Sequence, residues 1–112
     1  MRRRASIRVV LVTAPPRRAR ALARSLVERR VAACVNLVPG VRSVFRWKGR
    51  TGEVRETLLL AKTSAARLPA LLAAVADLHP YEVPEAIALA VDAGLPDYIE
   101  WVREETAGRD RP

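Results

Sequence analysis

The spacing of apolar residues changes near the start of the chain, from an almost continuous run to the three- and four-residue spacing of a helix. Residues 7–13 (IRVVLVT) are mostly apolar, which is typical of a strand in a covered sheet. After Pro15 and Pro16 the apolar side chains recur three and four positions apart, and they are Ala19, Leu22, Ala23, Leu26 and Val27. Because proline is tolerated in the first turn of a helix, the pattern predicts a strand followed by an amphipathic helix that begins at the two prolines.

A long hairpin is predicted for the middle of the chain. Residues 31–47 have the pattern of one strand, in which Pro39-Gly40 marks a break or bulge. The segment 48–52 (KGRTG) carries two glycines and predicts a hairpin loop, and the returning strand is expected over residues 53–63. Within that strand residues 58–61 are continuously apolar, so both of its faces are expected to be covered.

The last third of the chain predicts a helix, a strand and a terminal helix. Helical spacing covers residues 65–78, with Thr63 and Ser64 as candidate N-caps. Residues 86–91 form an apolar strand, and Asp97 is the candidate cap of a last helix that ends near Thr106.

The order β-α-β-β-α-β with one further helix predicts an α+β fold, a ferredoxin-like sandwich with an antiparallel sheet. We assign this domain to residues 7–107, with a basic extension before it (residues 1–6) and a polar tail after it (residues 108–112). Two helices cover one face of such a sheet, and the terminal helix is too short to cover the other face, which carries large aliphatic side chains. We therefore expect copies of the chain to associate through that face.

Composition limits the class of protein. The 112 residues are 50% apolar, which is enough for one domain with a hydrophobic core, and no apolar run approaches the roughly 18 residues that cross a bilayer. The basic start at residues 1–4 resembles a signal-peptide start, but Arg8 and Pro15 interrupt the following apolar run, so a cytoplasmic location without a membrane partner is expected. The single cysteine, Cys34, has apolar neighbours that indicate a buried residue, with a reactive thiol as the alternative.

The net charge of +8 raises the question of an anionic macromolecular partner. Eighteen of the 20 basic residues are arginine, and they are scattered through the predicted elements without interleaved aromatic residues. RNA-recognition domains share the β-α-β-β-α-β order and place base-stacking aromatics on the third strand, but residues 54–60 (VRETLLL) include none. A solvated arginine surface is therefore favoured, and a basic nucleic-acid-binding module is the alternative function.

The segment 79–85 (HPYEVPE) is the strongest candidate for a site. It holds the only histidine of the chain, and its two prolines restrict both themselves and the residues before them, His79 and Val83, to extended conformations. The result is a stiff connector that carries an imidazole, a phenol and carboxylates.

Catalytic signatures are not found in the sequence. It contains no Ser/His/Asp set, no phosphate-binding glycine loop and no metal-hydrolase spacing. An acid–base pair of His79 and Glu85 is conceivable, but no other feature supports it. We expect a protein that is not an enzyme.

Several short segments, in this order and spacing, resemble the CutA family, which is named for divalent-cation tolerance. They are residues 12–15 (VTAP), 30–36 (RVAACVN), 39–40 (PG), 60–63 (LAKT), 79–85 (HPYEVPE) and 97–101 (DYIEW), together with Ser43, Phe45, Trp47 and Gly49. The resemblance implies a ferredoxin-like subunit in a stable homotrimer similar to PII-type signalling proteins, with hairpin strands paired across subunits. It also implies an association with copper or another divalent cation, and a cleft between subunits that is lined by Trp47, Lys62, Tyr81, Glu85, Tyr98 and Trp101.

The chain departs from the family's copper pattern. Members with proposed copper ligands carry a cysteine in the first strand and two histidines before the proline, and the matching positions here are Val12, Leu78 and His79. A tight transition-metal site needs three or four ligands. The metal candidates are therefore His79 and Glu85, in a site completed by other carboxylates or by three-fold symmetry.

Each candidate also has a structural alternative. His79 could end a helix by bonding to nearby carbonyl groups, and Glu85 could form an ion pair with Lys62 instead of holding a cation. Lys62 ends an apolar run, so it needs either an acidic partner in the oligomer or an anionic ligand. Tyr81 and Tyr98 could anchor loops, and Trp47 and Trp101 could belong to an interface. The resemblance therefore implies a trimer that acts in divalent metal (copper) tolerance, with these residues binding a metal ion or a small anion in its cleft.

Overall fold

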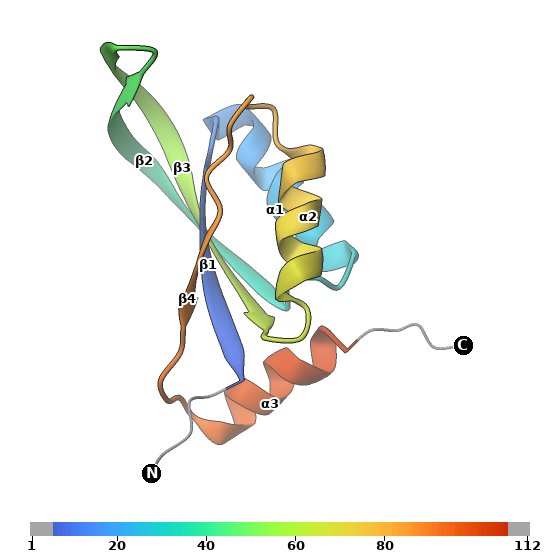
Figure 1. The fold of residues 1–112 in the computed structure, drawn as a ribbon. Helices are drawn as coiled ribbons and strands as arrows, with labels where there is room; N and C mark the ends of the chain where they lie inside the picture. The colour runs from blue at the N-terminus through green and yellow to red at the C-terminus, as the bar shows by residue number, and fades with distance from the viewer. Residues whose placement is uncertain (1–5, 108–112) are drawn as a thin grey trace.

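Four strands form an antiparallel sheet in the order β2-β3-β1-β4 in the computed structural model, which describes residues 6–107 (Figure 1). Along the chain the elements are β1 (Ile7–Ala14), α1 (Pro16–Glu28), β2 (Cys34–Trp47), β3 (Arg50–Ser64), α2 (Leu68–Leu78), β4 (Ile87–Ala90) and α3 (Pro96–Glu105). This order confirms the predicted α+β fold with a terminal helix. Most of the predicted N-terminal extension, residues 1–5, and the predicted tail, residues 108–112, lie outside the described residues.

Helices α1 and α2 cover one face of the sheet, and the core lies between them and the strands (Figure 1). Alternate residues of each strand point to this face, as the two-residue period of a strand requires. The fully buried aliphatic side chains include Val10 and Val12 of β1, Leu59 of β3, Leu26 of α1, and Leu71 and Val75 of α2. Burial of each such side chain contributes about 1.5–3 kcal/mol, so this layer provides most of the stability of the subunit.

The hairpin of β2 and β3 extends beyond the body of the subunit (Figure 1). Its register shifts between Val38 and Val41, which confirms the predicted bulge at Pro39-Gly40. The predicted loop over residues 48–52 is too long, because Trp47 already pairs with Arg50. The turn consists of Lys48 and Gly49, whose φ angles of 51° and 79° are those of a type I′ turn, the geometry that fits the twist of a two-residue hairpin.

Helix α2 begins later than its spacing predicts. The candidate caps Thr63 and Ser64 belong to β3, where they pair with Arg8 and Ile7 of β1. The polypeptide then turns, with the Arg67 amide donating to Ser64 Oγ at 3.3 Å, and the helix starts at Leu68 beside a proline in its first turn. Pairing with a distant strand therefore takes precedence over a local cap.

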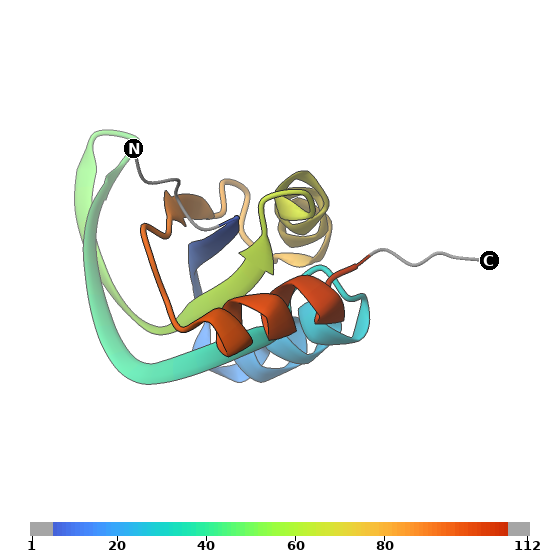
Figure 2. The same ribbon diagram turned by 90° about the horizontal axis from the view of Figure 1, so that it is seen from below.

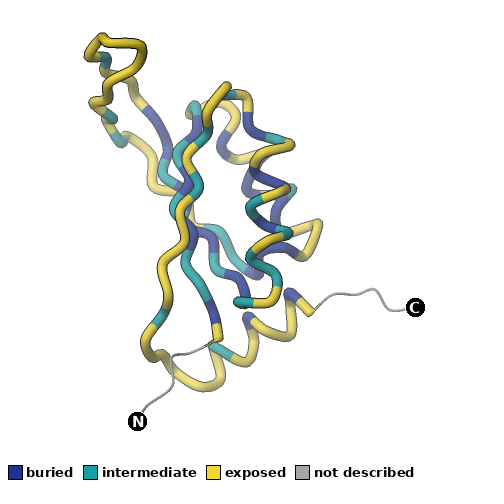
Figure 3. The backbone as a smooth tube through the Cα atoms, viewed as in Figure 1, coloured by how far each residue is buried: buried dark blue, intermediate teal, exposed yellow. Residues whose placement is uncertain are grey.

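The sheet face opposite α1 and α2, here called the open face, is only partly covered. Helix α3 crosses one end of it (Figure 2), where Val102 packs against Ile7 and Ala33. Beyond α3, the side chains of Ile87 and Leu89 are 53% and 50% exposed. Figure 3 shows β4 as an exposed strand beside β1, whose residues are buried or intermediate. The prediction that the terminal helix leaves apolar residues uncovered is confirmed for the single subunit.

None of the helices in residues 6–107 has both the length and the apolar content that crossing a membrane requires.

Candidate functional site

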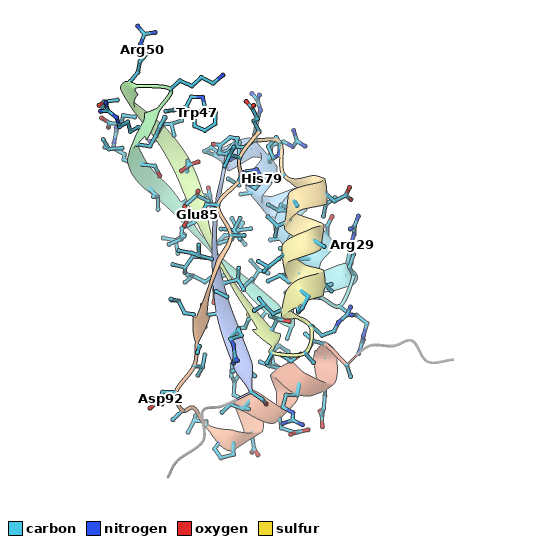
Figure 4. The ribbon with its side chains drawn as sticks, in the orientation of Figure 1. Arg29, Trp47, Arg50, His79, Glu85 and Asp92 are labelled. Atoms are coloured by element: carbon cyan, nitrogen blue, oxygen red, sulfur yellow. The ribbon has the colours of Figure 1, made fainter. Side chains whose placement is uncertain are left out.

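The connector between α2 and β4, residues 79–85, lies beside the hairpin end of the sheet. Figure 4 shows Trp47 at this end of the molecule, with His79 next in line and Glu85 further towards the middle of the sheet. His79 has φ −75° and ψ 138°, the extended conformation that Pro80 favours in the residue before it. The connector is therefore held straight at its start by its own sequence.

His79 is buried, and both of its ring nitrogens have protein partners. Its Nδ1 accepts a hydrogen bond from the Tyr81 amide at 3.2 Å, and its Nε2 lies 2.7 Å from the Thr13 carbonyl oxygen. Because an amide can only donate, the proton of the imidazole sits on Nε2, which donates to Thr13. The ring thus ties the end of α2 to β1, and a role as metal ligand requires it to give up one of these bonds.

Tyr81 contacts a buried carboxylate that the sequence did not single out. Its hydroxyl donates to Glu56 Oε2 at 2.7 Å, and Ser43 Oγ donates to Glu56 Oε1 at 2.6 Å. Glu56 is only 4% exposed. Burial, followed by the hydrogen bond to Glu56 and the negative charge of that residue, raises the pKa of Tyr81 to about 12. The phenol therefore stays protonated and serves as a hydrogen-bond donor.

Glu85 lies at the margin of the same group, with its side chain exposed. Its Oε1 accepts a hydrogen bond from Thr13 Oγ1 at 3.3 Å. Since Thr13 pairs with Leu58 and alternates with the core residues Val12 and Ala14, both side chains belong to the open face. We call the residues of this group the connector cluster: Thr13, Ser43, Glu56, His79, Tyr81 and Glu85.

A second group lies where α3 crosses the open face. Lys62 pairs with Val9 and Cys34, and its Nζ donates to Asn36 Oδ1 and, at 3.4 Å, to the Leu60 carbonyl oxygen. The rings of Tyr98 and Trp101 lie 5.6 Å apart, between centroids. Burial and then the neighbouring Cys34 raise the pKa of Tyr98. Cys34 itself is half-buried rather than fully buried. We call this the α3 cluster: Cys34, Asn36, Lys62, Tyr98 and Trp101.

The predicted cleft residues thus fall into two sets within one subunit. Tyr81 and Glu85 belong to the connector cluster, and Trp47 lies at the same end of the molecule with Lys48 Nζ 5.7 Å from its ring (Figure 4). The other three, Lys62, Tyr98 and Trp101, belong to the α3 cluster. Glu85 bonds to Thr13, whereas Lys62 pairs with Val9, four residues earlier on β1. One subunit therefore does not form the ion pair between Lys62 and Glu85.

The residues of a single subunit do not fit a tight transition-metal site. Within residues 6–107, no group of three or more His, Cys, Asp or Glu side chains is placed to hold a metal ion. His79 and Cys34 belong to different clusters, and the imidazole nitrogens of His79 are already hydrogen-bonded. Any tight site would need ligands from another subunit.

Three members of the connector cluster, Thr13, Ser43 and Glu56, were not recognised as site residues from the sequence. Glu56 lies two residues before the apolar run of β3, and a carboxylate at that position either faces solvent or needs donors. The position of Glu56 near this run was the signal in the sequence that could have identified it as a site residue. The donors Tyr81 and Ser43 are brought to it only by the folded chain.

Comparisons with known proteins agree with one another. The sequence model of the family described as "CutA1 divalent ion tolerance protein" matches residues 8–105. The divalent-cation tolerance protein CutA of Thermus thermophilus is 50% identical over 99 residues, 88% of this chain and 96% of that protein. Mouse protein CutA is 45% identical over 90% of this chain, which spans 58% of that longer protein.

Solved structures show the same fold. The structure described as "PII-like protein CutA" from Nostoc sp. PCC 7120 superposes with a TM-score of 0.85 at 40% identity, and the alignment covers 88% of this chain and 96% of that one. The names of other relatives place them in different compartments, since one from Arabidopsis thaliana is called chloroplastic and one from Archaeoglobus fulgidus periplasmic.

Proposed function

Because this chain belongs to the CutA1 divalent ion tolerance family, we propose that it is a non-enzymatic homotrimer that acts in the response to divalent metal ions such as copper. In this proposal the trimer binds a metal ion or a small anion in a cleft between subunits, in the cytoplasm. The sheet supplies the interface, and the two clusters on the open face supply the cleft.

The separation of the two clusters along one uncovered apolar face is the observation that carries this proposal. Ile87 and Leu89 are half exposed in the single subunit, an arrangement that favours burial against another copy. The connector cluster and the α3 cluster lie towards opposite ends of this face. In a closed ring of three subunits, one end of the open face in each copy would lie against the opposite end of the open face in the next copy. Trp47, Tyr81 and Glu85 of one subunit would then meet Lys62, Tyr98 and Trp101 of its neighbour.

The charges of the two clusters indicate what such a cleft would hold. Among the described residues Lys62 has only the neutral acceptors Asn36 and Leu60, and Glu85 has only the neutral donor Thr13. Across an interface these two groups either neutralise each other or bind an anion and a cation. In the binding mode we propose, Lys62 holds an anionic group, Glu85 is the principal metal contact and His79 is the second metal candidate.

Solution mass and calorimetry test the proposal. The mass of the purified chain is expected to equal three subunits, and a monomer at micromolar concentration would refute the cleft. Titration with Cu(II), Cu(I) and Zn(II) should give saturable heat that is reduced in Glu85→Gln and unchanged in the control Glu105→Gln, which removes an exposed carboxylate from α3. If His79→Ala leaves the heat and stoichiometry unchanged, His79 is not a ligand.

A charge exchange tests the pairing of the two clusters. Lys62→Glu and Glu85→Lys are each expected to weaken the trimer, and the double variant is expected to recover part of the loss because it restores opposite charges. If the losses of trimer stability in the two single variants simply add in the double variant, Lys62 and Glu85 do not contact each other. A nucleic-acid partner is not proposed, because β3 carries no aromatic residue on which a base could stack.

A further inference from the structure

A cavity of about 290 Å³ lies away from the connector cluster, where the end of β3 and the turn before α2 meet the last turn of α3. It is lined by Ser6, Ser64, Arg67, Arg103, Thr106 and two alanines. Two of these residues are cationic and three carry hydroxyl groups, and no acidic side chain takes part. The cavity therefore has the character of an anion site.

The guanidinium of Arg67 is the main reason to expect an anion there. The side chain is partly buried, and its Nε atom is buried without an acceptor among the described residues. The ion pairs and side-chain hydrogen bonds of residues 6–107 include none for this guanidinium. Removing a charged donor from water without a partner is costly, so an acceptor is expected next to it.

One hydroxyl group of the cavity is free to donate as well. Ser6 Oγ accepts from Arg103 Nη1 at 3.1 Å and keeps its own proton for another acceptor. Ser64 Oγ accepts from the Arg67 amide at 3.3 Å, but its proton is used in the 3.2 Å contact with Thr106 Oγ1, because the single proton of Thr106 goes to the Val102 carbonyl oxygen at 2.8 Å. Arg103 has one carboxylate nearby, Glu100, at 3.9 Å and largely in solvent. The cavity thus offers two guanidinium groups and the Ser6 hydroxyl group to one guest.

We propose that this cavity binds a phosphate-type oxyanion, either inorganic phosphate or the phosphate group of a small molecule. Several donors from different directions suit the diverging oxygens of a tetrahedral anion, and the planar fork of arginine matches a pair of those oxygens. The proposal is independent of the metal response and of the cleft, because none of its residues belongs to the connector cluster or the α3 cluster.

Titration of the full-length chain with inorganic phosphate at constant ionic strength tests the site. We expect saturable binding with one phosphate per subunit, weakened roughly tenfold or more in Arg67→Gln and to a smaller extent in Arg103→Gln. The matched control is Arg18→Gln, which removes the same charge from the exposed surface of α1 and should leave the affinity unchanged. A phosphomonoester such as glycerol phosphate, titrated in parallel, distinguishes the two sources of the anion by which of them binds more tightly.

The outcomes distinguish phosphate binding at this cavity from general attraction of phosphate to the positive charge of the protein. Equal weakening in Arg18→Gln and Arg67→Gln, or no saturation, would refute the proposal. If Arg67→Gln does not fold, Arg67→Lys replaces it, and this variant should keep the charge and the circular dichroism spectrum but bind phosphate more weakly. If Arg67→Gln alters the mass of the oligomer and leaves phosphate affinity unchanged, Arg67 pairs with a neighbouring subunit and the proposal is wrong.

Discussion

The hydroxyl of Tyr81 donates a 2.7 Å hydrogen bond to the buried carboxylate of Glu56, 25 positions earlier in the sequence. Through this bond the connector is fastened to β3, and Ser43 adds a third element to the same carboxylate. The His79 ring lies 4.7 Å from the Tyr81 ring and is bonded to β1. The position of the connector is therefore set by three strands, so the backbone that carries the exposed Glu85 is held in place.

The raised pKa of Tyr81 predicts a loss of stability at high pH. The folded chain holds the phenol proton up to about pH 12, whereas the unfolded chain releases it near 10.0. The stabilising contribution is therefore complete below pH 10 and is lost as the pH rises through 12. Chemical denaturation at a series of pH values measures it, and Tyr81→Phe should show a shallower fall over this range. Identical pH profiles for the two proteins would contradict the prediction.

Replacement of Glu56 by glutamine should destabilise the fold. The amide substitutes a donor for one of the two oxygens that accept from Tyr81 and Ser43, so one hydroxyl loses its acceptor, at a cost of about 1–3 kcal/mol in the free energy of unfolding. The same variant should lower the pKa of Tyr81, because the negative charge is gone.

The control for this variant is Glu53→Gln on the same strand. Glu53 pairs with Arg42 in solvent at 3.2 Å, so its loss is expected to cost at most about 1 kcal/mol. Equal losses of unfolding free energy in Glu56→Gln and Glu53→Gln would show that the burial of Glu56 does not raise the cost of replacing it.

The hairpin turn predicts a purely conformational effect at Gly49. Its φ of 79° is unfavourable for a residue with a Cβ, and apart from its two chain neighbours no atom of residues 6–107 lies within 4 Å of the position a Cβ would take. Gly49→Ala should therefore cost roughly 1–2 kcal/mol through the backbone alone. In contrast, a Cβ at Gly52 would lie 2.8 Å from Phe45 Cζ, so Gly52→Ala should displace that ring. Denaturation midpoints and the NMR signals of Phe45 separate the two effects, and an unchanged midpoint for Gly49→Ala would contradict the first.

An arginine on the open face should prevent self-association without unfolding the subunit. Leu89 is half exposed in the single subunit, so Leu89→Arg removes few contacts within one chain, but it would place a charge in the interface. The mass in solution should fall to that of one chain. Val27→Arg on α1, on the helix side of the sheet, should leave the mass unchanged. If the Leu89→Arg protein keeps the wild-type mass in solution, the interface does not include Leu89 and lies elsewhere on the subunit.

The order of the elements was predictable because local periodicity determines it, and the element boundaries were less so. The first helix and the bulge at Pro39-Gly40 follow from proline, glycine and apolar spacing alone. The start of α2 was predicted too early because Thr63 and Ser64 are good helix caps locally. Their pairing with β1 joins residues far apart in the sequence, which local patterns do not contain.

The site was predictable in its location but not in its hydrogen bonds. The two prolines of the connector made its stiffness evident, and His79 has the predicted extended backbone. The acceptor of its ring, Thr13, is 66 positions away, and the donors that make Glu56 a buried residue are 13 and 25 positions away. A glutamate within a strand is usually exposed, so its burial is a consequence of tertiary structure.

The hydrogen bond from Arg103 to Ser6 has a practical consequence for protein engineering. It brings residue 6 within reach of the last helix, and Ala107 lines the same cavity as Ser6. A short linker from residue 107 to residue 6 should therefore close the polypeptide into a ring, and the ring could be cut between Lys48 and Gly49. Such a circular permutant would carry its new termini at the hairpin tip, where a fluorophore or an affinity tag would sit far from α3.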